Sequence, residues 1–326
     1  MKRVIKSVVL GVVMLTSSLF LLGSCKNDDE KPVKEVPSTL TFSSEALYPE
    51  GIAYHSQSQT FVVGSIKQGT IGTVDFTGKY TLLVNDPSLV STYGIKVSGN
   101  FAYVCTGDIG NGAKSSSATT GKVAKVLKID LSQKRLVQTY DLSSLVTGAV
   151  FPNDLAIDDA ENIYVTESFQ GFLYKIDKSG KASIFLENDL FKGEGFNLNG
   201  IVFHKGGYLL VDKTNTGKIL KVNLSNKSVS EVNLPAPIEG ADGLALNGES
   251  LYVVGYSSGV ISELKSNDNW QTAIVVATDT IGYEGPTAAT IAEGKTYVLN
   301  AKVLEMINNP ATASSKTFTI KRYQAQ

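Results

Sequence analysis

This chain of 326 residues has no surplus of basic charge and contains only two histidines and two cysteines. Its 30 Lys and Arg are balanced by 31 Asp and Glu, so no surplus positive charge exists to neutralise phosphates, and nucleic acid is not expected as a partner. Beyond residue 40, apolar residues almost never recur at helical spacing, and short β-rich runs are separated by Gly, Asn, Asp and Ser. The body of the chain is therefore predicted to be all-β.

The N-terminus has an apolar run that is too short to span a membrane. The run from Val8 to Leu22 is shorter than the ~20 residues of a spanning helix, and it follows basic residues, as in an export signal. It ends in small residues before Cys25, which resembles the bacterial lipobox. We interpret residues 1–24 as a lipoprotein signal peptide and Cys25 as the lipidated residue. A secretory peptide with an incidental cysteine is the alternative.

Residues 25–38 form a polar, charge-rich stretch with little to bury, so we expect a disordered tether. The acidic run just after the cysteine resembles the export signal of Gram-negative lineages that display lipoproteins on the cell surface. It implies a protein of the bacterial cell envelope, lipid-anchored to the outer membrane and facing the periplasm or the exterior. A lipidated Cys25 leaves Cys105 without a disulfide partner, in an apolar run typical of a buried strand.

Residues 39–326 contain a repeat. Each copy begins with a residue that carries a polar group, and an apolar strand, a turn and a second strand rich in Tyr and Val follow. The six copies start at Glu50, Tyr93, Asn153, Asn199, Asp242 and Thr287. Their separations are 43, 60, 46, 43 and 45 residues, and a period of about 40 to 50 residues is typical of propeller blades. The repeat predicts a six-bladed β-propeller with four-stranded blades, closed by residues 39–42 and 317–323 within one blade.

The longest interval contains an insertion at residues 107–122, between two strands of the second blade. Two interpretations remain open: a flexible lid over one face of the ring, or a tolerated surface loop without function. The motif Gly-x-Ser-x-Gly at residues 255–259 joins two strands with no helix after it, so it is predicted to be a hairpin turn rather than a nucleophile elbow.

The repeat starts are expected to lie close together, because the first strand of every propeller blade runs along the central channel. Two carboxylates and two carboxamides then meet at one end of the axis, from Glu50, Asn153, Asn199 and Asp242. Each residue alone is also an ordinary turn residue. Together they form an oxygen-rich cage that suits one divalent cation, and Ca²⁺ is favoured, with Mn²⁺, Mg²⁺ and Zn²⁺ as alternatives. Zn²⁺ is less expected because no histidine or cysteine occupies a repeat start.

Four segments around these residues resemble the metal-ligand segments of the senescence marker protein/gluconolactonase family, in the calcium-dependent phosphotriesterase superfamily: 48–51, 151–158, 198–201 and 240–244. The family consists of six-bladed propellers, several of them calcium- or zinc-dependent lactone hydrolases. The resemblance implies that Glu50, Asn199 and Asp242 are metal ligands. It further implies that Asn153 lines the site through the metal or a bound water, and that Asp242 is the general base.

The expected function is that of a monomeric, metal-dependent hydrolase of small lactones or related esters, in which the metal polarises the carbonyl group. Further residues expected to line the substrate site, on weaker grounds, are Tyr93, Thr287, Glu194 and Glu284. Two alternatives remain open, because fold does not decide function. One is a non-catalytic propeller that binds a glycan, peptide or partner protein with a structural metal. The other is a scaffold with an empty axis.

Overall fold

The computed structural model of this chain describes Met1 and residues 35–326, of which residues 36–326 form one compact unit. The interpreted signal peptide, the lipidation site at Cys25 and most of the interpreted tether lie outside the described residues. Within the described part of the chain, no helix has the length and apolar character needed to cross a membrane.

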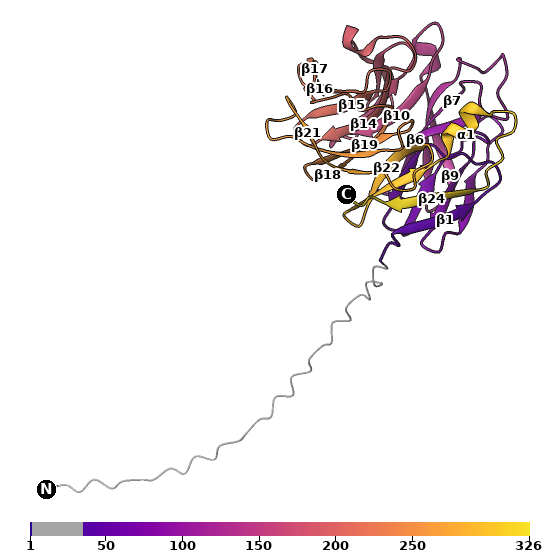
Figure 1. Cartoon of the computed structure of the whole chain (residues 1–326). Helices are drawn as coiled ribbons and strands as arrows, with labels where there is room; N and C mark the ends of the chain where they lie inside the picture. Colours follow the sequence, from indigo (N-terminus) through magenta and orange to yellow (C-terminus); the bar gives the residue numbers. More distant parts are fainter. Residues whose placement is uncertain (2–34) are drawn as a thin grey trace. The chain divides into compact units, whose positions relative to one another are not determined.

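The compact unit consists of six antiparallel four-stranded sheets, which confirms the predicted six-bladed propeller (Figure 1). From the axis outward, blade one contains β2 (Ile52–His55), β3 (Thr60–Val63), β4 (Ile71–Asp75) and β5 (Tyr80–Val84). Blade two contains β6 (Ser91–Ser98), β7 (Phe101–Gly107), β8 (Ala124–Asp130) and β9 (Arg135–Asp141). Blade three contains β10 (Pro152–Ile157), β11 (Ile163–Glu167), β12 (Phe172–Ile176) and β13 (Ala182–Glu187). Blade four contains β14 (Leu198–His204), β15 (Tyr208–Lys213), β16 (Lys218–Asn223) and β17 (Val229–Glu231). Blade five contains β18 (Ala241–Asn247), β19 (Ser250–Gly255), β20 (Ile261–Lys265) and β21 (Ile274–Asp279). Blade six contains β22 (Pro286–Ala292), β23 (Lys295–Asn300), β24 (Thr317–Arg322) and β1 (Thr39–Ser43).

The described residues contain few helical turns. Two short 3₁₀ turns, η1 (Ser143–Leu145) and η2 (Asp189–Phe191), lie in inter-blade connections. One α-helix, α1 (Val303–Asn308), is inserted between β23 and β24, and nothing in the sequence pattern predicted it. The residue 255–259 segment is a turn between β19 and β20, as expected.

The inner strands pack so closely that a side chain has little room at the glycines that follow four of the six repeat starts. The innermost strands β2, β6, β10, β14, β18 and β22 contact one another in a closed ring. A Cβ atom on Gly51 would lie 2.1 Å from the Tyr93 carbonyl oxygen of the next blade, and one on Gly243 would lie 2.4 Å from that of Thr287. Glycine at these positions therefore permits the close approach of neighbouring backbones.

The ring is closed by the two ends of the described domain. β1 pairs with β24 along its whole length, from Thr39 opposite Lys321 to Ser43 opposite Thr317, and Figure 1 shows the indigo β1 beside the yellow β24. This is the predicted closure. It covers the edge that β24 would otherwise expose.

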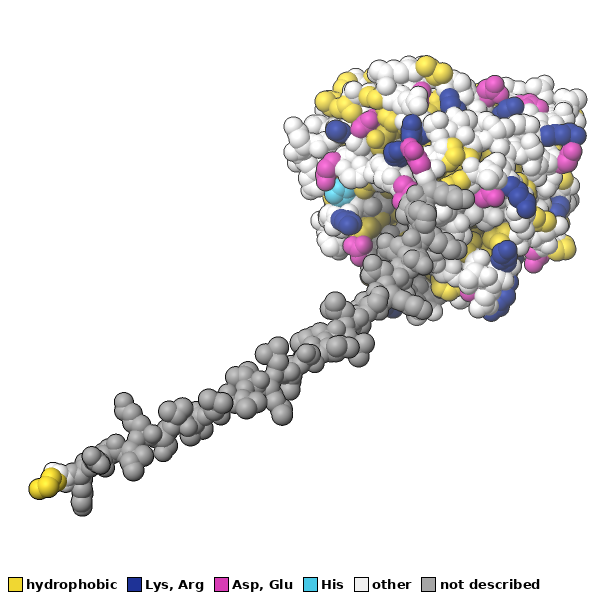
Figure 2. Space-filling model, turned by 90° about the horizontal axis from the view of Figure 1, so that it is seen from below, with side chains coloured by type: hydrophobic (Ala, Val, Ile, Leu, Met, Phe, Trp, Pro, Cys, Tyr) yellow, Lys and Arg dark blue, Asp and Glu magenta, His cyan; other side chains and the backbone are white. Residues whose placement is uncertain are grey.

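The core lies between the blades, where the alternate side chains of neighbouring sheets meet. On β1, Leu40 and Phe42 are buried while Thr39, Thr41 and Ser43 are exposed, which is the period of two expected for a strand with one covered face. Cys105 on β7 is fully buried and free, as predicted. On the outside, the face in Figure 2 carries Lys, Arg, Asp and Glu side chains scattered singly, without a large area of one sign.

We predict that Phe42→Ala lowers the free energy of unfolding by about 3–5 kcal/mol, because the ring packs 5.9 Å from that of Phe318 inside the closing blade. The matched control is Thr41→Ala on the exposed face of the same strand, for which a loss below about 1 kcal/mol is expected. Chemical denaturation measures both values. Equal losses in the two variants would show that the closing strand contributes no core packing.

Candidate metal centre

The repeat-start residues of the inner strands lie at interruptions of the sheet pairing. The pairing of the first and second strands shifts register between Thr92 and Ile95, between Pro152 and Leu155, between Leu198 and Ile201, and between Ala241 and Leu244. Such a bulge adds a residue on one strand and re-aims its side chain. In blades two to five the repeat start therefore marks a bulge of the inner strand at the end of the axis.

All six repeat starts line one cavity of about 80 Å³ at this end of the axis. They form its floor: Glu50, Tyr93, Asn153, Asn199, Asp242 and Thr287. The structure thus brings together residues up to 237 positions apart, such as Glu50 and Thr287, whose hydroxyl donates to the Glu50 carbonyl oxygen at 2.8 Å. That bond shows Thr287 holding the backbone at Glu50.

The two asparagines are oriented by hydroxyl groups behind them. Asn153 Nδ2 donates to Ser168 Oγ at 3.1 Å, and Asn199 Nδ2 donates to Thr214 Oγ1 at 3.1 Å. Because each amide nitrogen is occupied in this way, the amide oxygen is left for another partner. Asn153 Oδ1 is buried and accepts no hydrogen bond within the described part of the chain.

The two carboxyl groups on the floor, those of Glu50 and Asp242, are both buried. Glu50 is 9% exposed and Asp242 is 7% exposed, and Glu50 Oε2 has no hydrogen-bond partner among the described residues. Burial, followed by the charges of Asp242 and Asp154, raises the pKa of Glu50 well above its usual range. Burial also raises the pKa of Asp242 to about 8, although a hydrogen bond from the Asn199 side chain acts to lower that pKa.

Below the floor, the channel contains an ion pair. It is formed by two residues that differ from those at the equivalent positions of the other blades. Lys96 Nζ lies 3.1 and 3.0 Å from the two carboxylate oxygens of Asp154, whose side chain is 9% exposed. Asp154 also accepts the Ile201 backbone N–H at 3.3 Å. The positions equivalent to Asp154 in the other blades are Gly51, Gly94, Gly200, Gly243 and Ala288. The positions equivalent to Lys96 are Ala53, Ala156, Val202, Ala245 and Thr290.

A fourth carboxyl group, that of Asp212, lies beside the floor. It is fully buried on β15, accepts the Gly200 N–H through Oδ1 at 3.0 Å, and has no partner for Oδ2 in the described residues. Burial and the nearby Asp242 raise its pKa well above the usual range. Neither Asp212 nor the Lys96–Asp154 pair was predicted from the sequence, although aligning the repeats marks Lys96 and Asp154 as the residues that break the small-residue pattern.

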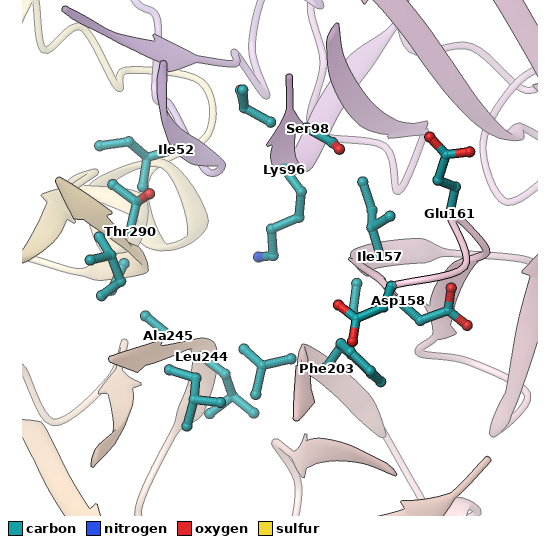
Figure 3. Close-up of a pocket in the computed structure, with 17 residues that line it drawn as sticks. Ile52, Lys96, Ser98, Ile157, Asp158, Glu161, Phe203, Leu244, Ala245 and Thr290 are labelled. Atoms are coloured by element: carbon teal, nitrogen blue, oxygen red, sulfur yellow. The ribbon is translucent and has the colours of Figure 1, made fainter. Parts of the chain in front are cut away.

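The opposite end of the channel opens into a cavity of about 520 Å³. In Figure 3, Lys96 extends into this opening, with Asp158 and Glu161 on one side of it. Asp158 is engaged in its own hairpin, where it accepts the N–H groups of Ala160 and Asn162 at 2.9 and 2.8 Å. Glu161 pairs with Lys178 at 3.2 Å. Asp158 and Glu161 thus have partners, whereas Glu50 Oε2 at the other end has none among the described residues.

The insertion of blade two reaches the rim of the 80 Å³ cavity and is held there by one buried carboxylate. Asp108 is fully buried and accepts hydrogen bonds from Gly110 N at 2.7 Å, Ser115 Oγ at 2.6 Å and Thr119 Oγ1 at 2.7 Å. Its neighbour Ile109 lines the cavity. The insertion is therefore tied down at its base rather than free.

Helix α1 occupies another part of the rim. Its Glu305 accepts the Tyr48 hydroxyl at 2.9 Å and also bonds Ser315, so the helix is tied to the segment that enters Glu50. Two expected lining residues lie elsewhere: Glu194 and Glu284 are exposed and do not line the cavity. Glu284 is instead 3.6 Å from Lys302.

The floor residues fit a hard divalent cation. Residues 35–326 contain no group of three His, Cys, Asp or Glu side chains placed to hold a metal ion, so amide oxygens must contribute to any site here. Glu50, Asn153, Asn199 and Asp242 offer such a set, and Glu50 Oε2 and Asn153 Oδ1 are buried without a hydrogen-bond partner among the described residues, which leaves both open to a cation. Ca²⁺ prefers this oxygen-only environment and completes its 6 to 8 ligands with water or substrate.

Comparison with known proteins shows the fold. No protein-family model matches the chain, and no curated protein matches its sequence. Similar solved structures include the major Malassezia sympodialis allergen Mala s 1, which is 14% identical with a TM-score of 0.69 over 88% of this chain and 96% of that one. A protein proposed to be a gluconolactonase is 11% identical, with a TM-score of 0.59 over 88% and 93%.

Virginiamycin B lyase from Staphylococcus aureus is also similar, at 13% identity and a TM-score of 0.56 over 88% of this chain and 99% of that one. At these identities the likeness establishes the propeller architecture alone. An allergen, a lyase and a proposed lactonase share it, so the chemistry has to be inferred from this chain's own site.

We predict that the cation-free protein loses stability as pH rises through about 8. The folded pKa of Asp242 is above its unfolded value of about 3.9, so the folded state binds more protons, and its advantage is lost as the group ionises. Glu50 acts in the same direction. Melting temperatures with a chelator should fall from about pH 5 to about pH 9, and excess Ca²⁺ should raise them most at the alkaline end. Identical profiles with chelator and Ca²⁺ would contradict the fit.

We predict that Asp108→Ala releases the insertion, because at least three donors lose a buried acceptor, at a cost of about 3 kcal/mol. Hydrogen exchange should accelerate in residues 108–122. The control is Asp86→Ala, which removes a half-buried carboxylate bonded to Ser88 in the connection between β5 and β6. If exchange in the insertion stays as slow as in the control, Asp108 does not hold it.

Proposed function

We propose that this protein is a cation-dependent hydrolase of lactones or related esters. The observation that carries the proposal is a pair of buried acceptors, Glu50 Oε2 and Asn153 Oδ1, which have no partner among residues 35–326. They lie on the floor of an open axial cavity beside Asp242 and Asn199. Burial of acceptors without donors is costly unless a cation or ligand completes the site. The resemblance of the surrounding segments to gluconolactonases supports the same choice.

The four floor residues Glu50, Asn153, Asn199 and Asp242 would hold one divalent cation, with Ca²⁺ favoured. When bound, that cation would polarise the substrate carbonyl and stabilise negative charge on its oxygen. Hydroxyl groups fix the amides that face it: Ser168 behind Asn153 and Thr214 behind Asn199. Because Ser168 and Thr214 directly follow the second strands β11 and β15 of the same blades, the floor is organised before substrate arrives.

Asp242 is the residue we assign to proton transfer. Its carboxylate would take a proton from a water molecule whose oxygen bonds to the carbonyl carbon. The acyl carbon–oxygen bond then breaks, and the proton passes to the leaving oxygen, so the lactone and one water yield one hydroxy acid. With a divalent cation bound nearby, the Asp242 carboxyl group would be ionised at neutral pH, since opposite charge lowers the pKa that burial raises to about 8.

The predicted lipid anchor would place this activity on the outer membrane of a bacterial envelope. Cys25 and the preceding signal lie outside the described residues, so the proposal rests on the sequence. The substrate would be a small molecule reaching a monomeric propeller, with the anchor as its contact to the membrane.

We predict that the purified protein hydrolyses lactones with Ca²⁺ and that Asp242→Asn lowers kcat/KM by about 10²-fold or more, because the proton acceptor is lost. Asp159→Asn, an exposed carboxylate near the opposite end of the channel, is the matched control and should retain wild-type activity. Release of acid from a lactone and ester panel is the measurement.

Two outcomes would count against this account. Full activity of Asp242→Asn would remove the proton-transfer role while leaving hydrolysis intact. A Ca²⁺-loaded protein without activity on any lactone or ester would exclude the proposed function and favour a binding propeller with a structural cation.

A further inference from the structure

The rim above the polar floor is apolar on nearly every side. We call it the apolar collar, and it consists of Ile66, Ile109, Phe151, Phe196, Tyr256, Val303, Met306 and Ile307. These residues come from loops of blades one, two and five, from the entry segments of the inner strands, and from α1. The collar therefore does not result from one hydrophobic element; separate connections each place an apolar side chain at the same opening.

Aromatic packing makes one side of the collar rigid. The ring of Phe151 lies 5.9 Å from that of Phe196 and 5.5 Å from that of Phe169, while Phe169 and Phe196 are 5.8 Å apart. Glu167 supports this wall from below by accepting the backbone N–H groups of Phe151 at 2.9 Å and Phe169 at 3.0 Å. Such an arrangement holds the rings in place before a ligand binds.

Two collar residues leave much of their surface uncovered. Phe196 is 41% exposed and Ile307 is 47% exposed, although both line the cavity. Burying this surface against an apolar group would be favourable, at about a fourfold gain in affinity for each methylene removed from water. The cavity of about 80 Å³ holds the reacting end of a ligand, so a longer substituent must extend over these side chains.

Charge and hydrogen bonding at the opening disfavour other ligands. The charged groups that line the cavity in the described structure are Glu50 and Asp242, both acidic, and no Lys or Arg is among its lining residues. The hydroxyl of Thr287 donates to the Glu50 backbone, and that of Thr214 accepts from Asn199. An anionic substrate would therefore find no cationic side chain in the described lining, and a polyhydroxylated one would exchange its hydrating water mainly for the Asn111 amide and the hydroxyls of Tyr93, Thr214 and Tyr256.

We infer that the site takes an uncharged lactone or ester bearing an alkyl chain or an aromatic ring. The carbonyl end lies on the polar floor and the substituent lies across the apolar collar. The reaction in this inference rests on the proposed function. The ligand class is inferred from the apolar collar, and binding of such a ligand can be measured separately from its hydrolysis.

The test compares kcat/KM for γ-lactones of increasing alkyl chain length with that for a sugar lactone. We expect a rise of about two- to fourfold per methylene over the first several carbons, with the sugar lactone poorest. Phe196→Ala and Ile307→Ala should lower the ratio of long-chain to short-chain kcat/KM several-fold. Leu82→Ala, which truncates a 51% exposed residue on the outer strand β5, should leave that ratio unchanged.

A binding experiment separates the two proposals. Calorimetry with cyclic ketones carrying the same alkyl chains, which cannot be hydrolysed, should show affinity that rises with chain length and falls in Phe196→Ala. Chain-dependent binding without hydrolysis would uphold the ligand class and exclude the hydrolase. Hydrolysis that is independent of chain length, or best with the sugar lactone, would overturn the ligand class alone. The absence of both binding and hydrolysis would overturn both.

Discussion

Buried negative charge on the propeller axis is the constraint on which the site depends. Glu50, Asp154, Asp212 and Asp242 are each at most 9% exposed, and they lie near one another around the inner strands. Carboxylates removed from water are costly unless they are protonated, paired or bound to a cation. Lys96 pairs with Asp154, which leaves the remaining groups to be balanced by protons in the free protein or by a divalent cation at the floor.

This constraint explains how the scaffold and the site are connected. Bulges aim the repeat-start side chains at the axis, and small residues beside them let the backbones of neighbouring blades approach. Hydroxyl groups of Ser168 and Thr214, directly after the second strands, orient the amides of Asn153 and Asn199. The closing pair of β1 and β24 completes the ring, so the blade that supplies Thr287 is built from both ends of the domain and held together by strand pairing.

The sequence predicted the parts of the molecule that follow the repeat. Six copies at a blade-sized period indicated the inner strands, and their starts indicated which side chains share the axis, because rotational repetition converts equivalent positions into neighbours. The collar could not be read in this way. Ile66, Ile109 and Ile307 lie in connections whose paths depend on tertiary contacts, such as the bonds to Asp108 and Glu305. The same lack of loop geometry accounts for Glu194 and Glu284, which lie near repeat starts in sequence yet point to solvent.

A cation held by Glu50, Asn153, Asn199 and Asp242 is the central claim, and crystals soaked with Mn²⁺ test it most directly. Anomalous scattering locates the ion without any assumption about activity. The account predicts one strong peak on the axis among the oxygens of these four residues, and its disappearance in Glu50→Gln. A peak elsewhere, or none at the axis in crystals whose floor residues are ordered, would contradict the account.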